Sequence, residues 1–225
     1  MAIFLCDWRG FVKNIIIIGA GDLGKEVVWL IEEINRNTPT YVILGFLDDD
    51  KAKDGGEFYG YRVLGDISKL EKLSAGNPCY AVIAIQDGTI RKKIVNDHPL
   101  FDMWESIIHP SAVIAKTSPL GNGSIAFPNV TVSVNSKLGC FELLYINSSI
   151  CNDCIIGDYV SLMSGASISE RAVIGDECFL GAGSTVYPHK ILGKRVRIGV
   201  GVTACKDYSD DCKVSGRETK FSLFK

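Results

Sequence analysis

Two side-chain pairs in the segment 148–158, SSICNDCIIGD, have types and spacings that chemistry can use. Cys151 and Cys154 form a C-x-x-C pair, a spacing that holds metal ions or redox disulfides in other proteins. Asn152 and Asp153 lie between them as a polar pair in a run of isoleucines. A redox C-x-x-C needs its first thiol at a helix N-terminus, where the thiol pKa is lowered. The surrounding pattern therefore decides between the two pairs.

Aliphatic residues recur every six positions from Ile114 to Ala204, over sixteen consecutive positions of which fourteen are Leu, Ile or Val. Neither a helix nor a flat strand has a period of six, whereas the hexapeptide repeat of a parallel β-helix does. The pattern predicts a left-handed prism in which three hexads make one turn and the aliphatic side chains fill the interior. Glycine follows the aliphatic residue in seven hexads, and we expect it to relieve backbone strain at the bends.

The same register assigns both cysteines of the C-x-x-C pair. Cys154 falls at a small inward position, Cys178 occupies the equivalent position farther on, and Cys151 falls at a bend. A pair that lies along a flat strand lacks the helix N-terminus that a redox thiol needs. We therefore expect no metal and no disulfide here, and Asn152 and Asp153 remain as the candidates for chemistry.

A glycine-rich loop at residues 19–24, GAGDLG, follows an apolar β-branched run and opens a helical pattern. Glycines in this setting allow a tight turn and bring backbone N–H groups to a phosphate at the helix N-terminus. Asp48 and Asp49 close the second expected strand, where carboxylates can accept hydrogen bonds from ribose hydroxyls or base N–H groups. The loop predicts a nucleotide site. For the two aspartates, a ligand contact and a solvated turn both stay open.

Strand and helix signals alternate over residues 14–108. Strands are expected in the segments NIIIIGAG, YVILGFLDDD, CYAVIAIQD and WESIIHP, with helices in GKEVVWLIEEI and TIRKKIV. This alternation predicts a small parallel sheet with helices on its faces. The chain thus divides into a Rossmann-like α/β domain at residues 1–108, with a short N-terminal extension, and the β-helix at residues 109–225, with a short C-terminal tail.

The composition narrows the class of protein. The chain has 225 residues, 47% of them hydrophobic and 22% charged, and a net charge of −2, which is not the basic excess of a nucleic-acid-binding protein. No apolar run reaches the roughly 18–20 residues of a membrane-spanning helix, and the first residues lack the apolar core of a signal peptide. We expect a cytoplasmic protein whose eight cysteines are free thiols.

The chain resembles the nucleotide-sugar N-acetyltransferases of bacterial glycan synthesis. These include enzymes acting on UDP-bacillosamine precursors and GDP-perosamine, with the related sialic-acid O-acetyltransferase group. The resemblance covers residues 13–218 and rests on the motifs IIIIGAGDLGKEV, GFLDDD, AIQDGTIRKKI, IIHPSAVI, INSSICNDCIIGDYVSLMSGA and IGDECFLGAGSTV. It implies a nucleotide-activated amino sugar in the N-terminal half, acetyl-CoA along the prism, and a homotrimer with active sites between subunits.

The family's functional positions carry over onto individual residues. The positions that would hold the nucleotide-sugar are Gly19, Gly21, Asp22, Leu23, Asp48, Asp49 and Gln86. The positions that would contact acetyl-CoA are Ser161, which stands where the family has a second histidine, and Ala182 and Val200, whose backbone would line the coenzyme channel.

The resemblance also places Asn152 and Asp153 at the catalytic position. The family has a histidine at the first position, as general base for the sugar amine, and an acidic neighbour that orients it. Asparagine cannot accept and release a proton near neutral pH. Three hypotheses follow. Asn152 positions the amine while Asp153 or water takes the proton, or the asparagine is an inactivating substitution, or the protein is an inactive nucleotide-sugar- or CoA-binding trimer. Acetyl transfer to a sugar hydroxyl is a further alternative, although hydroxyls need a base more than amines do.

Basic residues gather in the last turns of the expected prism, namely Lys190, Lys194, Arg195, Arg197 and Lys206. They would attract the phosphates of a coenzyme, or they would form an ordinary charged rim.

Overall fold

The computed structural model describes residues 12–76 and 78–216. The expected N-terminal extension, which includes Cys6, and the expected C-terminal tail lie outside the described residues. Within the described ranges, no helix combines the length and apolar character needed to cross a bilayer.

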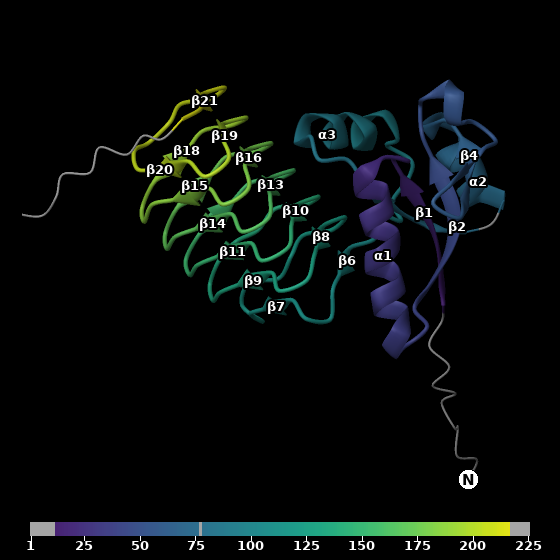
Figure 1. Cartoon of the computed structure of the whole chain (residues 1–225), viewed down its shortest axis with the longest axis horizontal. Coiled ribbons are helices and arrows are strands. Elements are labelled where there is room, and N and C mark those ends of the chain that lie inside the picture. The colour runs from purple at the N-terminus through teal and green to yellow at the C-terminus, as the bar shows by residue number, and fades with distance from the viewer. Residues whose placement is uncertain (1–11, 77, 217–225) are drawn as a thin grey trace, which may run out of the picture.

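A five-stranded sheet of order β3-β4-β2-β1-β5 forms the centre of the N-terminal domain (Figure 1). Its strands are β1 (Lys13–Ile18), β2 (Tyr41–Leu47), β3 (Glu57–Phe58), β4 (Tyr61–Gly65) and β5 (Tyr80–Ile83). The helices are α1 (Asp22–Asn37), α2 (Leu70–Gly76) and α3 (Gly88–Asp97), with 3-10 turns η1 (Lys51–Lys53) and η2 (Ile67–Lys69). All paired strands run parallel except β3 and β4, which confirms the predicted α/β class.

The isoleucine run of β1 explains why this strand is buried in the core of the N-terminal domain. Successive side chains of a strand point to opposite faces of the sheet. Ile15 and Ile17 pack with α1, whereas Ile16 and Ile18 pack on the other face, where Leu70 of α2 and Ile94 of α3 lie. All four isoleucines are fully buried, as expected for a parallel strand covered by helices on both sides.

The remaining strands form the predicted parallel β-helix, with three flat faces (Figure 1). The first face contains β6 (Ile107–Ile108), β8 (Ile125–Ala126), β10 (Leu143–Leu144), β13 (Ser161–Leu162), β16 (Phe179–Leu180), β19 (Arg197–Ile198) and β21 (Lys213–Val214). The second contains β7 (Val113–Ile114), β9 (Thr131–Val132), β11 (Ser149–Ile150), β14 (Ser167–Ile168), β17 (Thr185–Val186) and β20 (Thr203–Ala204). The third contains β12 (Ile155–Ile156), β15 (Val173–Ile174) and β18 (Ile191–Leu192).

The hexad register is confirmed by the strand pairing. Ser161 pairs with Leu143 on one side and with Phe179 on the other, so one coil takes 18 residues, or three hexads. Thirteen of the sixteen predicted interior residues are buried, and Ile114, Leu120 and Leu138 are partly buried against the same core. The aliphatic period therefore determines the interior of the prism.

The β-helix begins earlier than the sequence suggests. Ile107 and Ile108 form β6, which pairs with β8 of the first face. The segment WESIIHP was expected as the last strand of the first domain, and that expectation is wrong, because most of its pairing lies in the prism. Only Trp104 pairs back to the first sheet, through an isolated bridge to Ala81. The segment thus joins the two domains directly.

The bends of the prism differ from the prediction. Positive φ angles fall three residues after the aliphatic residue of a hexad, as at Asn135 (φ 60°) and Asp153 (φ 58°), and not on Cys151 or on the glycines that follow the aliphatic residues. A Cβ on Gly175 would lie only 2.6 Å from the carbonyl carbon of Gly193 in the next coil. These glycines therefore allow the coils to stack closely, and the predicted catalytic pair occupies a turn.

One buried carboxyl group breaks the rule of small inward residues. Glu142 is 1% exposed and occupies the inward position at which the neighbouring coils have Ser124 and Val160. Its Oε1 accepts a hydrogen bond from the Gly139 N–H at 3.1 Å, while Oε2 has no partner among the described residues. Burial, opposed by that hydrogen bond and by the charge of Arg91, raises the pKa of Glu142 well above its ordinary value.

Candidate functional site

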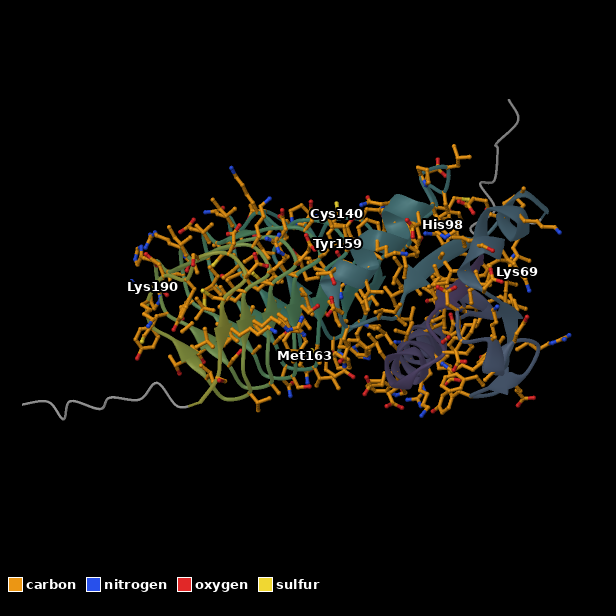
Figure 2. The ribbon with its side chains drawn as sticks, turned by 90° about the horizontal axis from the view of Figure 1, so that it is seen from above. Lys69, His98, Cys140, Tyr159, Met163 and Lys190 are labelled. Carbon is orange, nitrogen blue, oxygen red and sulfur yellow. The ribbon has the colours of Figure 1, made fainter. Side chains whose placement is uncertain are left out.

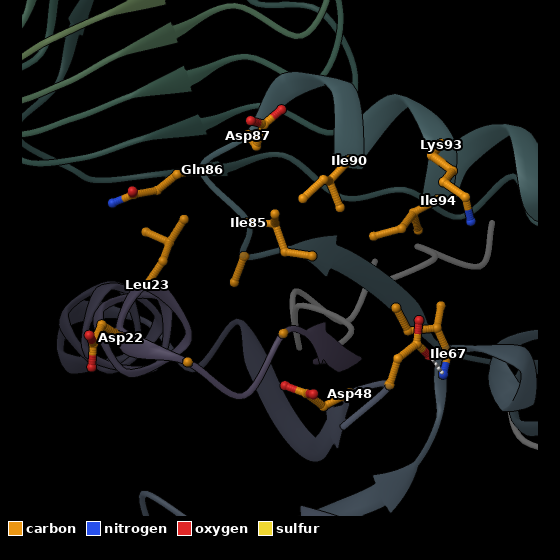
Figure 3. Close-up of a pocket in the computed structure, with 14 residues that line it drawn as sticks. Asp22, Leu23, Asp48, Ile67, Ile85, Gln86, Asp87, Ile90, Lys93 and Ile94 are labelled. Carbon is orange, nitrogen blue, oxygen red and sulfur yellow. Dashed lines mark hydrogen bonds between the residues drawn. The ribbon is translucent and has the colours of Figure 1, made fainter. Parts of the chain in front are cut away.

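A cavity of about 610 Å³ opens at the carboxyl ends of β1, β2 and β5. The chain passes from β1 to β2 on one side and reaches β5 on the other, so this is the point of an open parallel sheet where ligands bind. Figure 3 shows the lining residues. All seven residues predicted to hold the nucleotide-sugar line the cavity, namely Gly19, Gly21, Asp22, Leu23, Asp48, Asp49 and Gln86. The structure brings this part of the predicted site together.

The glycine loop has the geometry that the sequence predicted. Gly19 adopts φ +106°, and a Cβ there would lie 2.8 Å from the carbonyl oxygen of Ala84. A Cβ on Gly24 would overlap the carbonyl oxygen of Gly19, whereas a Cβ on Gly21 would meet nothing within 4 Å. Gly21 is the N-cap of α1 and provides no side-chain cap. The first N–H groups of α1 are therefore open to an anion from the cavity side.

Asp48 holds the glycine loop in place through its carboxylate. Its carboxylate accepts hydrogen bonds from the backbone N–H groups of Ala20 (2.8 Å) and Asp50 (2.9 Å) and from Nζ of Lys53 (2.9 Å). Burial raises the pKa of Asp48, but these donors outweigh burial and hold it below its ordinary value. Asp49 is exposed, and only its Oδ1 is engaged, by the Ile67 N–H at 3.0 Å. Asp49 thus has more carboxylate surface to offer a ligand than Asp48 has.

Arg91 joins the cavity wall to the β-helix, and sequence reasoning missed it. Its side chain is 2% exposed. The guanidinium donates hydrogen bonds only to oxygen atoms without formal charge, which are the carbonyls of Ile85 (2.9 Å), Gln86 (2.8 Å), Phe141 (3.0 Å), Tyr159 (2.8 Å) and Val160 (3.2 Å) and the hydroxyl of Ser161 (3.1 Å). Burial lowers the pKa of Arg91 to about 10, so the group stays charged at neutral pH. Arg91 lies three residues from each of Gly88 and Ile94, the other buried residues of α3, and this helical spacing was the sequence signal that could have placed it on the buried face.

Ser161 lies inside this joint and not on an open surface. Its side chain is 0% exposed, and its hydroxyl donates a 2.7 Å hydrogen bond to the carbonyl oxygen of Gln86. Figure 2 shows Tyr159, two residues before it, on the part of the β-helix near α3. In this chain the hydroxyl of Ser161 is therefore committed to the domain interface and has no surface for a coenzyme.

Asn152 and Asp153 form a contacting pair at the corner between the second and third faces. Nδ2 of Asn152 donates a 2.7 Å hydrogen bond to Oδ2 of Asp153. The same carboxylate oxygen lies 3.7 Å from Nη2 of Arg171, one coil farther on. Both members of the pair are partly exposed. The pair combines an amide that can donate a hydrogen bond to a polar group with a carboxylate that can accept one.

The predicted catalytic pair and the predicted coenzyme residues Ala182 and Val200 lie at different corners of one prism. Asn152 and Asp153 lie between β11 and β12, at the corner between the second and third faces, while Ala182 and Val200 lie on stacked turns between the first and second faces. Helix α3 covers the third corner, where a Cβ on Gly88 would overlap the Tyr159 carbonyl oxygen. None of the β-helix residues lines the cavity. A single chain therefore does not assemble the whole predicted site.

Cys154 and Cys178 occupy inward positions of the prism, as the repeat predicted. All seven that the structure describes are free. Cys154 and Cys178 are buried, and burial raises the pKa of both thiols, that of Cys178 to about 12. Within the described ranges, no group of three or more His, Cys, Asp or Glu side chains is arranged to hold a metal ion. Cys154 and Cys178 are core residues of the prism.

The basic residues near the end of the prism are largely paired with acids. Lys194 contacts Asp176 at 2.8 Å, and Arg195 forms a two-pronged pair with Asp211. Arg197 differs from these, because its partner Asp87 lies in the other domain, at 3.2 Å.

Comparison with protein families gives a match in the N-terminal part of the chain. Residues 14–98 match the PglD N-terminal domain. Among curated proteins, UDP-N-acetylbacillosamine N-acetyltransferase of Bacillus subtilis is 27% identical over 115 residues, which are 51% of this chain and 51% of that protein. The chain thus aligns with about half the length of this curated relative.

Solved structures match nearly the whole chain. The acetyltransferase domain of PglB from Neisseria gonorrhoeae, in complex with acetyl coenzyme A, has a TM-score of 0.81 and 25% identity and covers 91% of this chain and 97% of its own. WeeI from Acinetobacter baumannii has a TM-score of 0.80 and 27% identity, with 91% and 97% covered. A histidine-to-asparagine mutant of perosamine N-acetyltransferase from Caulobacter crescentus, in complex with CoA and GDP-perosamine, has a TM-score of 0.79 and 25% identity, with 90% and 93% covered. These matches confirm the predicted fold and the resemblance to the nucleotide-sugar N-acetyltransferases.

Proposed function

We propose that this chain, which is similar to the nucleotide-sugar acetyltransferases, transfers the acetyl group of acetyl-CoA to the amino group of a nucleotide-linked amino sugar. Bacterial surface-glycan synthesis is the process that such a product serves. The observation that carries this proposal is the cavity beside β1, which gathers all seven predicted nucleotide-sugar residues in a chain that also has a complete β-helix.

The reaction makes a C–N bond and breaks a C–S bond. The neutral amine of the sugar attacks the thioester carbonyl, and the tetrahedral intermediate collapses with release of CoA as a thiol. The attacking nitrogen must lose one proton on the way. Asn152 cannot take that proton, so its role is to orient the amine, while Asp153 or a water molecule accepts the proton. Backbone N–H groups at the edge of the prism would stabilise the oxyanion.

A homotrimer would complete the site. The catalytic pair and the predicted coenzyme residues Ala182 and Val200 lie at different corners of one prism, so a neighbouring copy must supply one of the two. Val200 is 78% exposed, and its backbone is open to a coenzyme in a groove between subunits. In this arrangement the nucleotide-sugar occupies the cavity of one subunit, and its amine reaches the Asn152–Asp153 corner at the groove.

The proposal also places the protein in the cytoplasm. Acetyl-CoA is a cytoplasmic metabolite, and the seven free cysteines that the structure describes fit a reducing compartment.

The test is direct measurement of acetyl transfer. The protein is incubated with acetyl-CoA and with UDP-, GDP- or dTDP-linked amino sugars, and thiol release is followed while mass spectrometry separates amide from ester products. We expect an amide product from one nucleotide class. Asp153→Asn should lower the rate by about 100-fold or more, whereas Asp211→Asn, at another corner, should not. An ester product would instead show O-acetylation.

An inactive binding trimer is the second candidate, and the position of Asn152 favours it. The amide of Asn152 donates a hydrogen bond to Asp153, and no imidazole stands at position 152. A histidine-to-asparagine mutant of a relative still holds CoA and GDP-perosamine, so both ligands can be bound when a histidine is replaced in this way. Saturable binding of a nucleotide-sugar and of CoA without any turnover would favour this candidate, and the absence of both binding and turnover would contradict both functions.

A further inference from the structure

The cavity has an excess of acidic side chains for a site that takes a diphosphate. Four aspartates line it, Asp22, Asp48, Asp49 and Asp87, with Lys93 as the basic lining residue. Nζ of Lys93 is paired with Asp97 at 2.8 Å. A nucleotide-sugar brings further negative charge on its two phosphates. A cation from outside this lining would offset this negative charge near the phosphates.

Arg197 of β19 is placed to be that cation. Its Nη1 lies 3.2 Å from Oδ2 of Asp87, which is the N-cap of α3 and lines the cavity. The guanidinium also lies over the ring of Phe179, 4.8 Å from its centroid, a contact that fixes the side chain without using its donors. In the part of the chain that the structure describes, Nη1 makes the only polar side-chain contact of Arg197. The side chain is 42% exposed, so Nε and Nη2 remain for a second anion.

The position of Asp87 fixes the end of the cavity that Arg197 serves. Figure 3 shows Asp87 near Gln86, while Asp48, Ile67 and Lys93 lie toward the opposite end. The end with Asp87 faces the β-helix, because Arg197 reaches it from there. A nucleoside at the Asp48 end would direct its diphosphate toward Arg197 and its sugar toward the prism.

We propose that Arg197 binds the diphosphate of the nucleotide-sugar and exchanges its single contact with Asp87 for a bidentate contact with phosphate oxygens. This inference rests on the proposed function and adds a substrate-binding residue from the β-helix to it. Guanidinium groups bind phosphate in this forked way. The phosphates of the coenzyme are the other possible source of the same chemistry. The nucleotide is favoured because the carboxylate that now holds Arg197 lines the cavity.

The experiment measures binding by calorimetry, without turnover. UDP, GDP and dTDP, the matching nucleosides and CoA are titrated into the wild-type protein and into Arg197→Gln. We expect the best nucleoside diphosphate to bind about 10- to 100-fold more weakly to the variant, the loss typical of charge-assisted hydrogen bonds. Binding of the matching nucleoside and of CoA should stay unchanged. Arg197→Lys should restore part of the loss, because it keeps the charge without the fork.

Arg195→Gln is the matched control. Arg195 lies on the same coil, is 39% exposed, and is already paired with Asp211, so its loss should leave diphosphate binding unchanged. Asp87→Asn, which can still cap α3, should tighten diphosphate binding severalfold in the wild type but not in Arg197→Gln, because the carboxylate competes for Arg197.

Three results would overturn the inference alone: unchanged diphosphate binding in Arg197→Gln, an equal loss for the nucleoside, or a loss confined to CoA. If the wild-type protein bound none of the three nucleoside diphosphates, both the proposed function and the inference about Arg197 would be wrong. The two failures are therefore distinguishable.

Discussion

The hydroxyl of Ser161 donates a 2.7 Å hydrogen bond to the carbonyl oxygen of Gln86, 75 residues away along the chain. Nη1 of Arg91 donates to the same two residues, at 2.8 Å to the Gln86 carbonyl and at 3.1 Å to the Ser161 hydroxyl. Gln86 lines the cavity and Ser161 belongs to the β-helix. These contacts fix the wall of the cavity to the prism.

Arg91→Met should reduce the stability of the joined domains. Methionine fills similar space but leaves the carbonyl oxygens of Phe141 and Tyr159 without the donor that Arg91 provides, whereas the Val160 carbonyl keeps the N–H of Leu143. A buried polar group that loses its partner costs about 1–3 kcal/mol, so we expect the free energy of unfolding to fall by about 3 kcal/mol or more. Urea denaturation measures it. Arg195→Met removes an exposed arginine instead and should cost less than about 1 kcal/mol. Equal losses of stability in the two variants would show that Arg91 does not hold the two domains together.

The sequence predicted the parts of this protein that depend on short-range pattern. The aliphatic period fixed which residues fill the prism, because a coil of three hexads places every sixth side chain inside. The glycine loop was also predictable, because Gly19 and Gly24 are required by contacts within one strand–turn–helix unit. The cavity residues after β1, β2 and β5 follow from the rule that parallel strands end at one edge.

The sequence could not predict contacts between distant segments. Arg91 looks like one more charge on an amphipathic helix until the β-helix is packed against α3. Ser161 was assigned to the coenzyme from its position in a motif, yet the neighbouring domain covers it. Asp48 likewise lies in a binding motif, but its carboxylate oxygens accept hydrogen bonds from the backbone N–H groups of Ala20 and Asp50. In each case a tertiary partner, absent from the local pattern, decides the role.

Glu142→Gln should make the protein more stable at neutral pH, with an effect that depends on pH. Burial raises the folded-state pKa of Glu142, and the groups that face it are Arg91, Asp158 and the Gly139 N–H. A raised folded pKa means that stability is fully present below the unfolded pKa, about 4.3, and is lost as pH rises through the folded pKa. Glutamine mimics the neutral acid and avoids this loss.

Urea unfolding of both proteins from pH 4 to pH 8 checks this. The two free energies of unfolding should differ least near pH 4, and the advantage of Glu142→Gln should grow as pH rises. Asp102→Asn serves as the control, because Asp102 is exposed and is not among the groups that face Glu142. A difference that stays constant with pH would show that Glu142 is not the titrating group.

Two glycines of the loop should respond to alanine in opposite ways. Gly24→Ala places a Cβ against the Gly19 carbonyl oxygen, so we expect a loss of stability of about 1–3 kcal/mol from the clash. Gly21→Ala meets nothing within 4 Å, and its φ of −126° suits alanine. Its stability should change by less than about 0.5 kcal/mol, while nucleoside diphosphate binding weakens because the methyl group covers the start of α1. Unfolding and calorimetry measure the two effects; normal nucleotide binding by Gly21→Ala would place the phosphates elsewhere.

Asn152→His should raise the rate of acetyl transfer. An imidazole beside Asp153 accepts a proton where the amide cannot, and general-base assistance is worth about 100- to 10,000-fold in kcat. The gain should appear as pH rises past the ordinary histidine pKa of about 6.5, since only the neutral imidazole is a base.

Asn135→His, at the same corner one coil away, is the matched control, because His189 shows that this corner accepts histidine at a positive φ. Initial rates of both variants from pH 5.5 to pH 8.5 are the measurement. Equal rates in Asn152→His, Asn135→His and the wild type would mean that this corner does not handle the proton of the reaction.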